Sequence, residues 1–330
     1  MRYPIFAAGA LFATMAGAQT PVLTVYTYDS FISEWGPGPE VEAAFEATCG
    51  CDLQFVGAGD GAALLGRLRL EGKRTHADVV LGLDTNLTAA AAETGLFAPH
   101  GVADVALSLP VSWEDELFLP YDWGYFAFVY DKTKLPHPPA SFAELAAAPK
   151  ELKIVIQDPR SSTPGLGLLL WVKAAYGDGA QAMWQGLAPH ILTVTKGWSE
   201  AYGMFLEGEA DMVLSYTTSP AYHIIAEGDD TKAAAPFAEG HYMQIEVAGR
   251  IASSDQPELA QEFLRFMLSE TFQSIIPTTN WMYPAVIPDA GLPEGFSAPL
   301  PPEQSLIYPA AEAAAMRDKA LEEWRAALSQ

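Results

Sequence analysis

Strand-like and helix-like segments alternate along most of this chain, and that alternation restricts the fold more than any other feature of the sequence. Near the start, three apolar runs typical of strands are each followed by a helical segment, at 22–28 and 41–47, at 53–56 and 62–70, and at 79–83 and 89–94. Such alternation is typical of a mostly parallel sheet with helices packed on it. The sequence therefore predicts an α/β protein.

Two long extended segments, 118–130 and 241–252, flank a second set of alternating strands and helices. The chain has 330 residues, half of them hydrophobic, which exceeds what a single hydrophobic core usually accommodates. We therefore expect a discontinuous first domain, 19–120 and 250–330, with a second domain, 121–249, inserted into it. A cleft between two domains that are joined by extended crossings can close around a small ligand.

The segment 1–18 has the pattern of a secretory signal peptide. It contains Arg2, an apolar run at 5–16 and three small residues at 16–18 before the expected cleavage site. The apolar run is shorter than the roughly 20 residues that a membrane-spanning helix needs, and no later segment is long and apolar enough. We expect an exported protein with no membrane-spanning helix and, because no cysteine lies near the cleavage site, no lipid anchor.

The chain is strongly acidic, with a formal net charge of −23. It has no cluster of Lys and Arg that could neutralise phosphates, which argues against nucleic acid as a partner. A cationic ligand fits the sign of the charge better. Bulk salt screens net charge beyond about 8 Å, so local carboxylates have to provide any selectivity.

Residues suited to catalysis or metal binding are sparse. Six histidines are scattered without the spacing of metal ligands, and no Gly-x-Ser-x-Gly nucleophile elbow occurs. The two cysteines, Cys49 and Cys51, lack a motif that would activate them. In an oxidising compartment they can pair, although a bridge across one residue stabilises little. We expect no metal site and no catalytic site.

The segment 194–223 has the composition of a ligand-cleft wall. Its run 212–216 is typical of a buried strand, and Ser219 followed by a proline predicts the start of a helix. Tyr216 then ends a strand and Tyr222 lies in the first helical turn, at the carboxyl edge of the sheet where α/β proteins bind ligands. Trp198 follows a turn in the same segment. Each ring alone can equally be a half-buried core edge, but three together favour a cleft.

Two turns between a strand and a helix offer polar contacts. In the first, Thr163 as helix cap, with Ser161 and Ser162 beside it, predicts an anion site at the start of a helix. In the second, Asp60 either caps the helix that begins at residue 62 or provides a carboxylate for a cationic ligand. Ordinary capping is the alternative for both turns.

Aromatic residues also mark two other places where elements end. Tyr28 closes the first predicted strand, and Trp281 lies in a loop at 278–284. Their flat faces can stack on a heteroaromatic ring or attract a cation, at roughly 0.5 to 2 kcal/mol each. A position in the hydrophobic core is the alternative.

These segments resemble the periplasmic thiamine-binding proteins of bacterial ABC importers, over essentially the whole chain after the signal segment. The matching motifs, in chain order, are PVLTVYTYDSF, WGPGP, DVVLGLD, the segment 121–132 apart from Trp123, QDPR followed by STPGLGLLLW, VTKGWSEAYG, VLSYTTSPAYH, QPELAQ and NWMYP. Motifs of this length in a fixed order are highly specific.

The resemblance implies a two-domain periplasmic-binding-protein fold of the group II type, with a ligand cleft between the domains. It implies capture of thiamine, thiamine monophosphate or thiamine diphosphate, without a cofactor, and delivery to the membrane permease of an ABC importer. Carried over by motif, the residues that line the vitamin are Tyr28, Asp60, Gly61, Trp198, Tyr216, Tyr222 and Trp281. Those that contact its phosphates are Ser161, Ser162 and Thr163.

Two alternatives belong to related proteins. A ferric-iron-binding relative is expected to carry an adjacent pair of tyrosines, whereas Tyr222 is followed by His223. A thiamine-degrading enzyme needs a nucleophilic cysteine in the cleft, and Cys49 and Cys51 lie after the first helix, where they are poorly placed for that role. Thiamine itself combines a thiazolium cation with an aminopyrimidine, which suits aromatic faces and a carboxylate.

Overall fold

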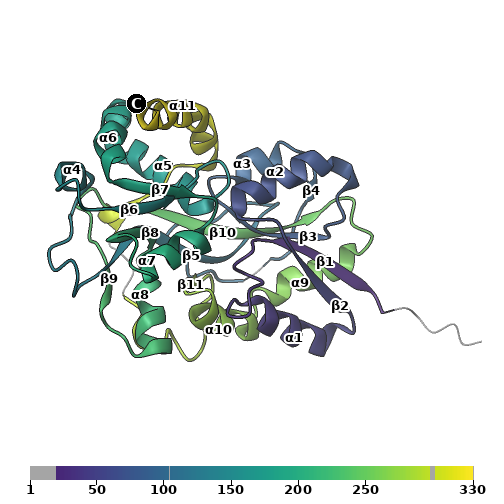
Figure 1. The fold of residues 1–330 in the computed structure, drawn as a ribbon. Helices are drawn as coiled ribbons and strands as arrows, with labels where there is room; N and C mark the ends of the chain where they lie inside the picture. The colour runs from purple at the N-terminus through teal and green to yellow at the C-terminus, as the bar shows by residue number, and fades with distance from the viewer. Residues whose placement is uncertain (1–19, 104, 298–301, 330) are drawn as a thin grey trace, which may run out of the picture.

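The computed structural model describes residues 20–103, 105–297 and 302–329, so the expected signal peptide lies outside the described residues. In the described chain the strands form one mixed sheet whose main path runs β2-β1-β3-β10-β5-β8-β6-β7. Helices cover both faces of this sheet (Figure 1). The expected α/β class is therefore confirmed.

The first half of the sheet is built from the predicted strand and helix pairs. β1 lies between β2 and β3 and runs parallel to both. The elements of this half are β1 (Val22–Thr27), α1 (Gly38–Cys49), β2 (Asp52–Gly57), α2 (Gly61–Glu71), the short 3₁₀ turn Gly72–Arg74, β3 (Val79–Asp84), α3 (Thr88–Ala92) and β4 (Phe97–Ala98). Each predicted strand and helix is present, with ends displaced by a few residues.

The two predicted extended crossings form the centre of the sheet. β5 (Leu119–Asp131) and β10 (His241–Ile251) run antiparallel to each other. β10 also pairs with β3, while the second part of β5 pairs with β8, so these two strands belong to both halves. Nearly every residue of both strands is buried, which explains their continuous apolar and aromatic composition.

The second half of the sheet repeats the alternation. β6 lies between β7 and β8 and is parallel to both. The elements of this half are α4 (Phe142–Ala147), β6 (Ile154–Gln157), α5 (Thr163–Tyr176), the 3₁₀ turn Gly177–Gly179, α6 (Ala180–Leu187), the 3₁₀ turn Ala188–His190, β7 (Ile191–Thr195), α7 (Trp198–Leu206), β8 (Met212–Tyr216), α8 (Ser219–Tyr222), the π-helical turn His223–Glu227 and β9 (Lys232–Ala234).

The C-terminal part of the chain returns to the first half and then crosses over. α9 (Pro257–Phe266) and α10 (Glu270–Thr279) pack with α1 under the first half (Figure 1). The remaining elements are β11 (Tyr283–Pro284), the 3₁₀ turn Pro302–Gln304, β12 (Ser305–Leu306) and α11 (Ala310–Leu328). No helix was expected over 270–279, and α10 forms there with Pro277 inside it.

Helix α11 does not stay with the first half, where the expected boundaries put it. It packs mainly against α5 and α6 of the second half and also reaches α3 (Figure 1). Trp324 and Leu321 are buried in this contact, and Lys173 on α5 donates to Glu323 at 2.9 Å. The domain boundaries at 120 and 250 stay a prediction, but the terminal helix ties the two halves together.

Among the described residues, no helix is both long enough and apolar enough to cross a membrane.

Candidate functional site

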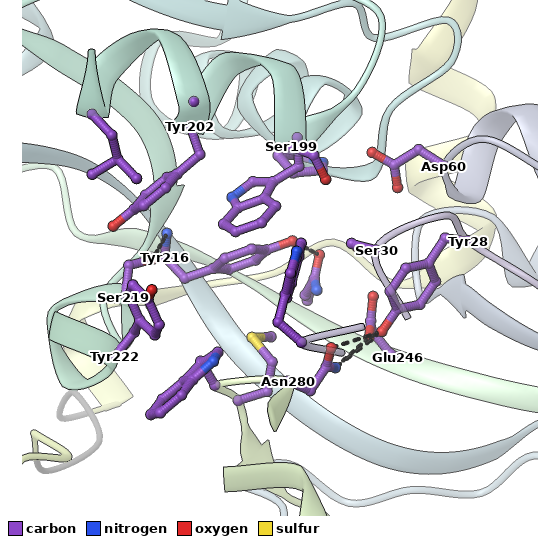
Figure 2. Close-up of a pocket in the computed structure, with 18 of the residues that line it drawn as sticks. Tyr28, Ser30, Asp60, Ser199, Tyr202, Tyr216, Ser219, Tyr222, Glu246 and Asn280 are labelled. Carbon is purple, nitrogen blue, oxygen red and sulfur yellow. Dashed lines mark hydrogen bonds between the residues drawn. The ribbon is translucent and has the colours of Figure 1, made fainter. Parts of the chain in front are cut away.

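A cavity of about 530 Å³ lies where elements of both halves of the sheet meet. Its aromatic lining consists of Tyr28, Trp35, Trp198, Tyr202, Tyr216, Tyr222 and Trp281. Its polar lining includes Ser30, Asp60, Ser199, Ser219, Gln244, Glu246 and Asn280. Figure 2 shows Tyr28, Asp60 and Glu246 gathered on one side, with Tyr202, Ser219 and Tyr222 opposite. No Lys, Arg or His is among the described residues that line the cavity.

The local sequence explains how the aromatic wall forms. Trp198 is the first residue of α7, so Tyr202 follows one helical turn later on the same face. Their rings stack with centroids 4.9 Å apart, and the Trp198 indole donates to Ser215 Oγ at 2.8 Å. Trp35 approaches Trp198 from the first half, at 6.0 Å between centroids. These contacts hold the indole of Trp198 in one orientation.

Trp281 has an unusual backbone conformation. Its φ is 57°, and among the described residues it is the only non-glycine residue with a positive φ. Such a conformation costs on the order of 1 to 3 kcal/mol and is concentrated at functional sites. The chain leaves α10 here, since the N–H groups of Asn280 and Trp281 both donate to Ile276 O. The turn brings the Trp281 ring to 5.2 Å from that of Tyr222.

A buried histidine supports the rings of Tyr202 and Tyr222 from behind. His223 Nε2 is 2.9 Å from the Tyr202 hydroxyl, and its Nδ1 is 2.6 Å from Glu227 Oε2. Its ring also packs edge-on against Tyr222. His223, Glu227 and Asp229 place potential metal-ligating atoms within 4.8 Å of one another. Both His223 nitrogens are already engaged by protein groups.

Asp60 combines the two roles that the sequence left open. Its Oδ1 accepts a hydrogen bond from Gly61 N at 2.8 Å and so caps α2, while the residue also lines the cavity. Its Oδ2 accepts from Ser162 Oγ at 2.7 Å. Burial raises the pKa of Asp60, and the hydrogen bonds from Ser162 and Gly61 oppose that rise.

The four other predicted residues lie beside the cavity and do not line it. Gly61 and Thr163 pack against each other, since a Cβ on Gly61 would lie 2.3 Å from Thr163 Oγ1. Ser162 is buried and directed to Asp60, and Ser161 Oγ donates to Lys196 O at 2.7 Å. Ser162, not Thr163, occupies the cap position of α5, because Thr163 is already helical. Pro164 is the residue of α5 that borders the cavity.

The floor of the cavity is a buried polar cluster that was not expected from the sequence. Glu246 Oε2 accepts hydrogen bonds from the hydroxyls of Tyr28 at 3.0 Å and Tyr121 at 2.8 Å. Asn280 donates from Nδ2 to Asp122 Oδ2 at 2.6 Å and to the Tyr28 hydroxyl at 3.0 Å. Burial raises the pKa of Glu246, and burial together with the charge of Glu246 raises the pKa of Asp122 well above its usual value. The sequence did contain a signal for this cluster: Asp122 and Glu246 are acidic residues inside two strongly apolar strands, β5 and β10.

Cys49 and Cys51 are joined by a disulfide at the end of α1. Neither cysteine is among the residues that line the cavity.

Comparison with known proteins identifies the family to which this chain belongs. The model of the bacterial extracellular solute-binding proteins matches residues 38–274. The thiamine-binding periplasmic protein of Escherichia coli (strain K12) is 58% identical over 310 residues, which cover 94% of each chain. The chain belongs to the family of thiamine-binding periplasmic proteins. The family member from Haemophilus influenzae is 49% identical over 280 residues, 84% of each chain.

Superposition on solved structures supports the same family assignment. A periplasmic thiamin binding protein superimposes with a TM-score of 0.91 at 55% identity, covering 99% of this chain and all of the other. Iron-bound HitA from Pseudomonas aeruginosa superimposes with a TM-score of 0.76 at 21% identity, covering 93% of this chain and 99% of the other, which shows a shared fold alone. The expected two-domain periplasmic-binding-protein fold is thereby confirmed, as is the periplasmic location of the family.

Proposed function

We propose that this protein captures thiamine in the periplasm and delivers it to the membrane permease of an ABC importer. The observation that carries the proposal is a cavity that combines aromatic faces with two carboxylates and, among its described lining residues, no basic side chain. A thiazolium cation is attracted both to aromatic faces and to carboxylates. The relatives that cover nearly the whole chain are named for the same vitamin.

We further propose that the protein binds thiamine without converting it and needs no cofactor. Both cysteines are used in one disulfide outside the cavity, so neither offers the thiolate that a thiamine-degrading enzyme requires. The aromatic wall needs only to close over the ligand. Binding without chemistry also suits a protein that must release the vitamin intact.

The phosphate esters of thiamine are included in this proposal. Pro164 borders the cavity, so the start of α5, a helix of fourteen residues, lies within reach of a phosphate tail. Free N–H groups and the helix dipole at such a terminus favour an anion. The Ser161 hydroxyl donates to Lys196 O and would have to rotate away from that carbonyl to donate to a phosphate, while Ser162 and Thr163 lie deeper. The Asp60 carboxylate and a phosphate would then share the same helix start.

Calorimetric titration with thiamine, thiamine monophosphate and thiamine diphosphate tests the proposal. Saturable one-to-one binding is the expected result, and the recovered ligand should be chemically unchanged after long incubation. Turnover of thiamine would identify a degrading enzyme. Absence of thiamine binding by the folded protein, with binding of ferric ion, would replace the proposal by iron transport.

A further inference from the structure

Two carboxylates lie directly opposite each other at the floor of the cavity. Glu246 on β10 and Asp122 on β5 are register partners in the antiparallel pair, and the two residues are 5% and 0% exposed. Like charges that face each other across two strands are destabilising, and burial increases the cost. Carboxylates whose pKa is shifted by burial and by a like charge are concentrated at functional sites.

The two carboxylates have different surroundings. Glu246 lines the cavity, with Tyr28 beside it (Figure 2). Its Oε2 accepts hydrogen bonds from the hydroxyls of Tyr28 and Tyr121. Asp122 lies behind it, with Oδ2 accepting from Asn280, whereas Oδ1 is buried and has no hydrogen-bond partner among the described residues. A proton on Asp122 therefore leaves Glu246 as the ionised group that faces the ligand.

Among the described residues, none that lines the cavity and none that perturbs the pKa of Glu246 is basic. The titratable groups that surround Glu246 come from five elements: Tyr28 after β1, Asp60 at the start of α2, Asp84 on β3, Tyr121 and Asp122 on β5, and Tyr216 on β8. All of them are acids or phenols. A cation that enters the cavity would be the first positive charge to reach Glu246.

We propose that Glu246 is the counter-ion for the permanent positive charge of the ligand, and that Asp122 is a positioning residue that holds the proton of the pair. This inference rests on the proposed function, because thiamine supplies the cation. It assigns cation selectivity to the floor of the cavity, whereas the charge of Asp60 is already engaged by Gly61 and Ser162.

The sign of the pH dependence follows from burial. Burial raises the pKa of Glu246, so the free protein takes up a proton at Glu246 at a higher pH than an ordinary glutamate does. A bound cation favours the ionised carboxylate and lowers that pKa. Protons and cation therefore compete, and affinity for thiamine falls as the pH falls through the pKa of Glu246 in the free protein.

The test compares thiamine with a neutral isostere in which a thiophene ring replaces the thiazolium. Wild type, Glu246→Gln and Asp122→Asn are titrated with both compounds between about pH 5 and pH 8, where a raised carboxylate pKa would show. Glu246→Gln should lower the affinity for thiamine by about tenfold or more, which corresponds to roughly 1.4 kcal/mol, at neutral pH. It should change binding of the neutral isostere little and remove most of the pH dependence.

Asp122→Asn tests where the proton of the pair lies. Asparagine is neutral, as a protonated Asp122 is, so the pH at which thiamine affinity falls should stay close to that of wild type, whereas a move to lower pH would show that Asp122 is ionised in wild type and would contradict its assigned proton. The ligand's own aminopyrimidine also titrates, but it contributes equally to all variants, so differences between variants isolate Glu246. Asp60→Asn should keep a pH dependence but move it to lower pH, because the charge of Asp60 contributes to the raised pKa of Glu246.

Equal losses for thiamine and the neutral isostere in Glu246→Gln would overturn the inference, as would unchanged binding of thiamine. If Glu246→Gln does not fold, judged by thermal melting, Glu246→Asp takes its place: it keeps the charge and should keep the preference for the cation, and loss of that preference would also overturn the inference. Wild-type protein that binds neither compound would contradict the proposed function itself.

Discussion

Ser162 Oγ donates a hydrogen bond to Asp60 Oδ2 at 2.7 Å and thereby joins the starts of α5 and α2, one in each half of the sheet. A second contact crosses the same boundary, since Ala63 N donates to Ser161 O at 3.0 Å. The Asp60 carboxylate thus lies at two helix N-termini, which favour a negative charge. The Asp60 side chain therefore caps α2, contacts the other half of the sheet and forms part of the cavity wall.

The link between Ser162 and Asp60 predicts different effects for two neighbouring serines. Ser162→Ala removes a donor from a partly buried carboxylate, which should cost about 1 kcal/mol of stability and weaken all three thiamine compounds. Ser161→Ala leaves Asp60 untouched and should weaken only the phosphate esters, by about threefold to tenfold for one lost hydrogen bond. Parallel calorimetric titrations and thermal melts measure both. Equal losses for thiamine and thiamine diphosphate in Ser161→Ala would remove the phosphate assignment.

Loss of both hydroxyls gives the sharpest separation of ligands. In the double variant Ser161→Ala with Ser162→Ala, affinity for thiamine monophosphate and diphosphate should fall by about tenfold or more, because hydrogen bonds to charged groups are stronger than those between neutral groups. Thiamine should lose less, since it has no anion at this position. The ratio of the two dissociation constants is the measurement, and a ratio equal to that of wild type would contradict the prediction.

The aromatic wall is expected to provide much of the affinity. Trp198→Ala or Tyr222→Ala should weaken thiamine binding by roughly 1 to 3 kcal/mol, as desolvated aromatic anchors usually do. Trp113→Ala is the control, because Trp113 is partly buried but lies outside the cavity. Titration of each folded variant decides the matter. Wild-type affinity in both cavity variants would show that stacking is unimportant.

Asp60 allows a test of charge apart from capping. Asparagine is as good a helix cap as aspartate, so Asp60→Asn should melt near the wild-type temperature. Loss of the negative charge should nevertheless weaken thiamine measurably, by less than the loss expected for Glu246→Gln. The experiment is a titration at low and at moderate salt, since screening reduces a charge effect. Binding identical to wild type would leave Asp60 with a capping role alone.

Gly82 controls the position of Tyr28. Its φ is 101°, and a Cβ there would lie 2.2 Å from Tyr28 Cδ1. Gly82→Ala should therefore destabilise the protein by about 1 to 3 kcal/mol from backbone strain, displace the Tyr28 ring and weaken thiamine binding. Gly95→Ala is the control, since Gly95 has φ of 65° with no atom within 4 Å of an added Cβ. Equal thiamine affinities in the two variants would exclude the steric effect on Tyr28.

The candidate site was predictable where local sequence sets the backbone. Tyr28, Tyr216 and Trp198 were placed correctly at element ends, because strand runs and turn residues are local signals, and all three line the cavity. Trp35 was missed because its loop has no regular pattern, and Glu246 was missed because it lies inside the segment 241–252, which was expected only as an extended crossing. Ser162 was expected to contact a phosphate, and its contact with Asp60 depends on residues 102 positions apart.

The sequence by itself determined the α/β alternation, the two extended crossings, the family and the aromatic character of the site, because hydrophobic periodicity and turn chemistry act over a few residues. Only the tertiary structure decided how buried charges are partnered. The register of β10 against β5 sets Glu246 opposite Asp122, and the packing of α2 against α5 brings Ser162 to Asp60. Both depend on long-range contacts whose geometry no local pattern encodes. The same holds for α11, which packs mainly against α5 and α6 of the second half.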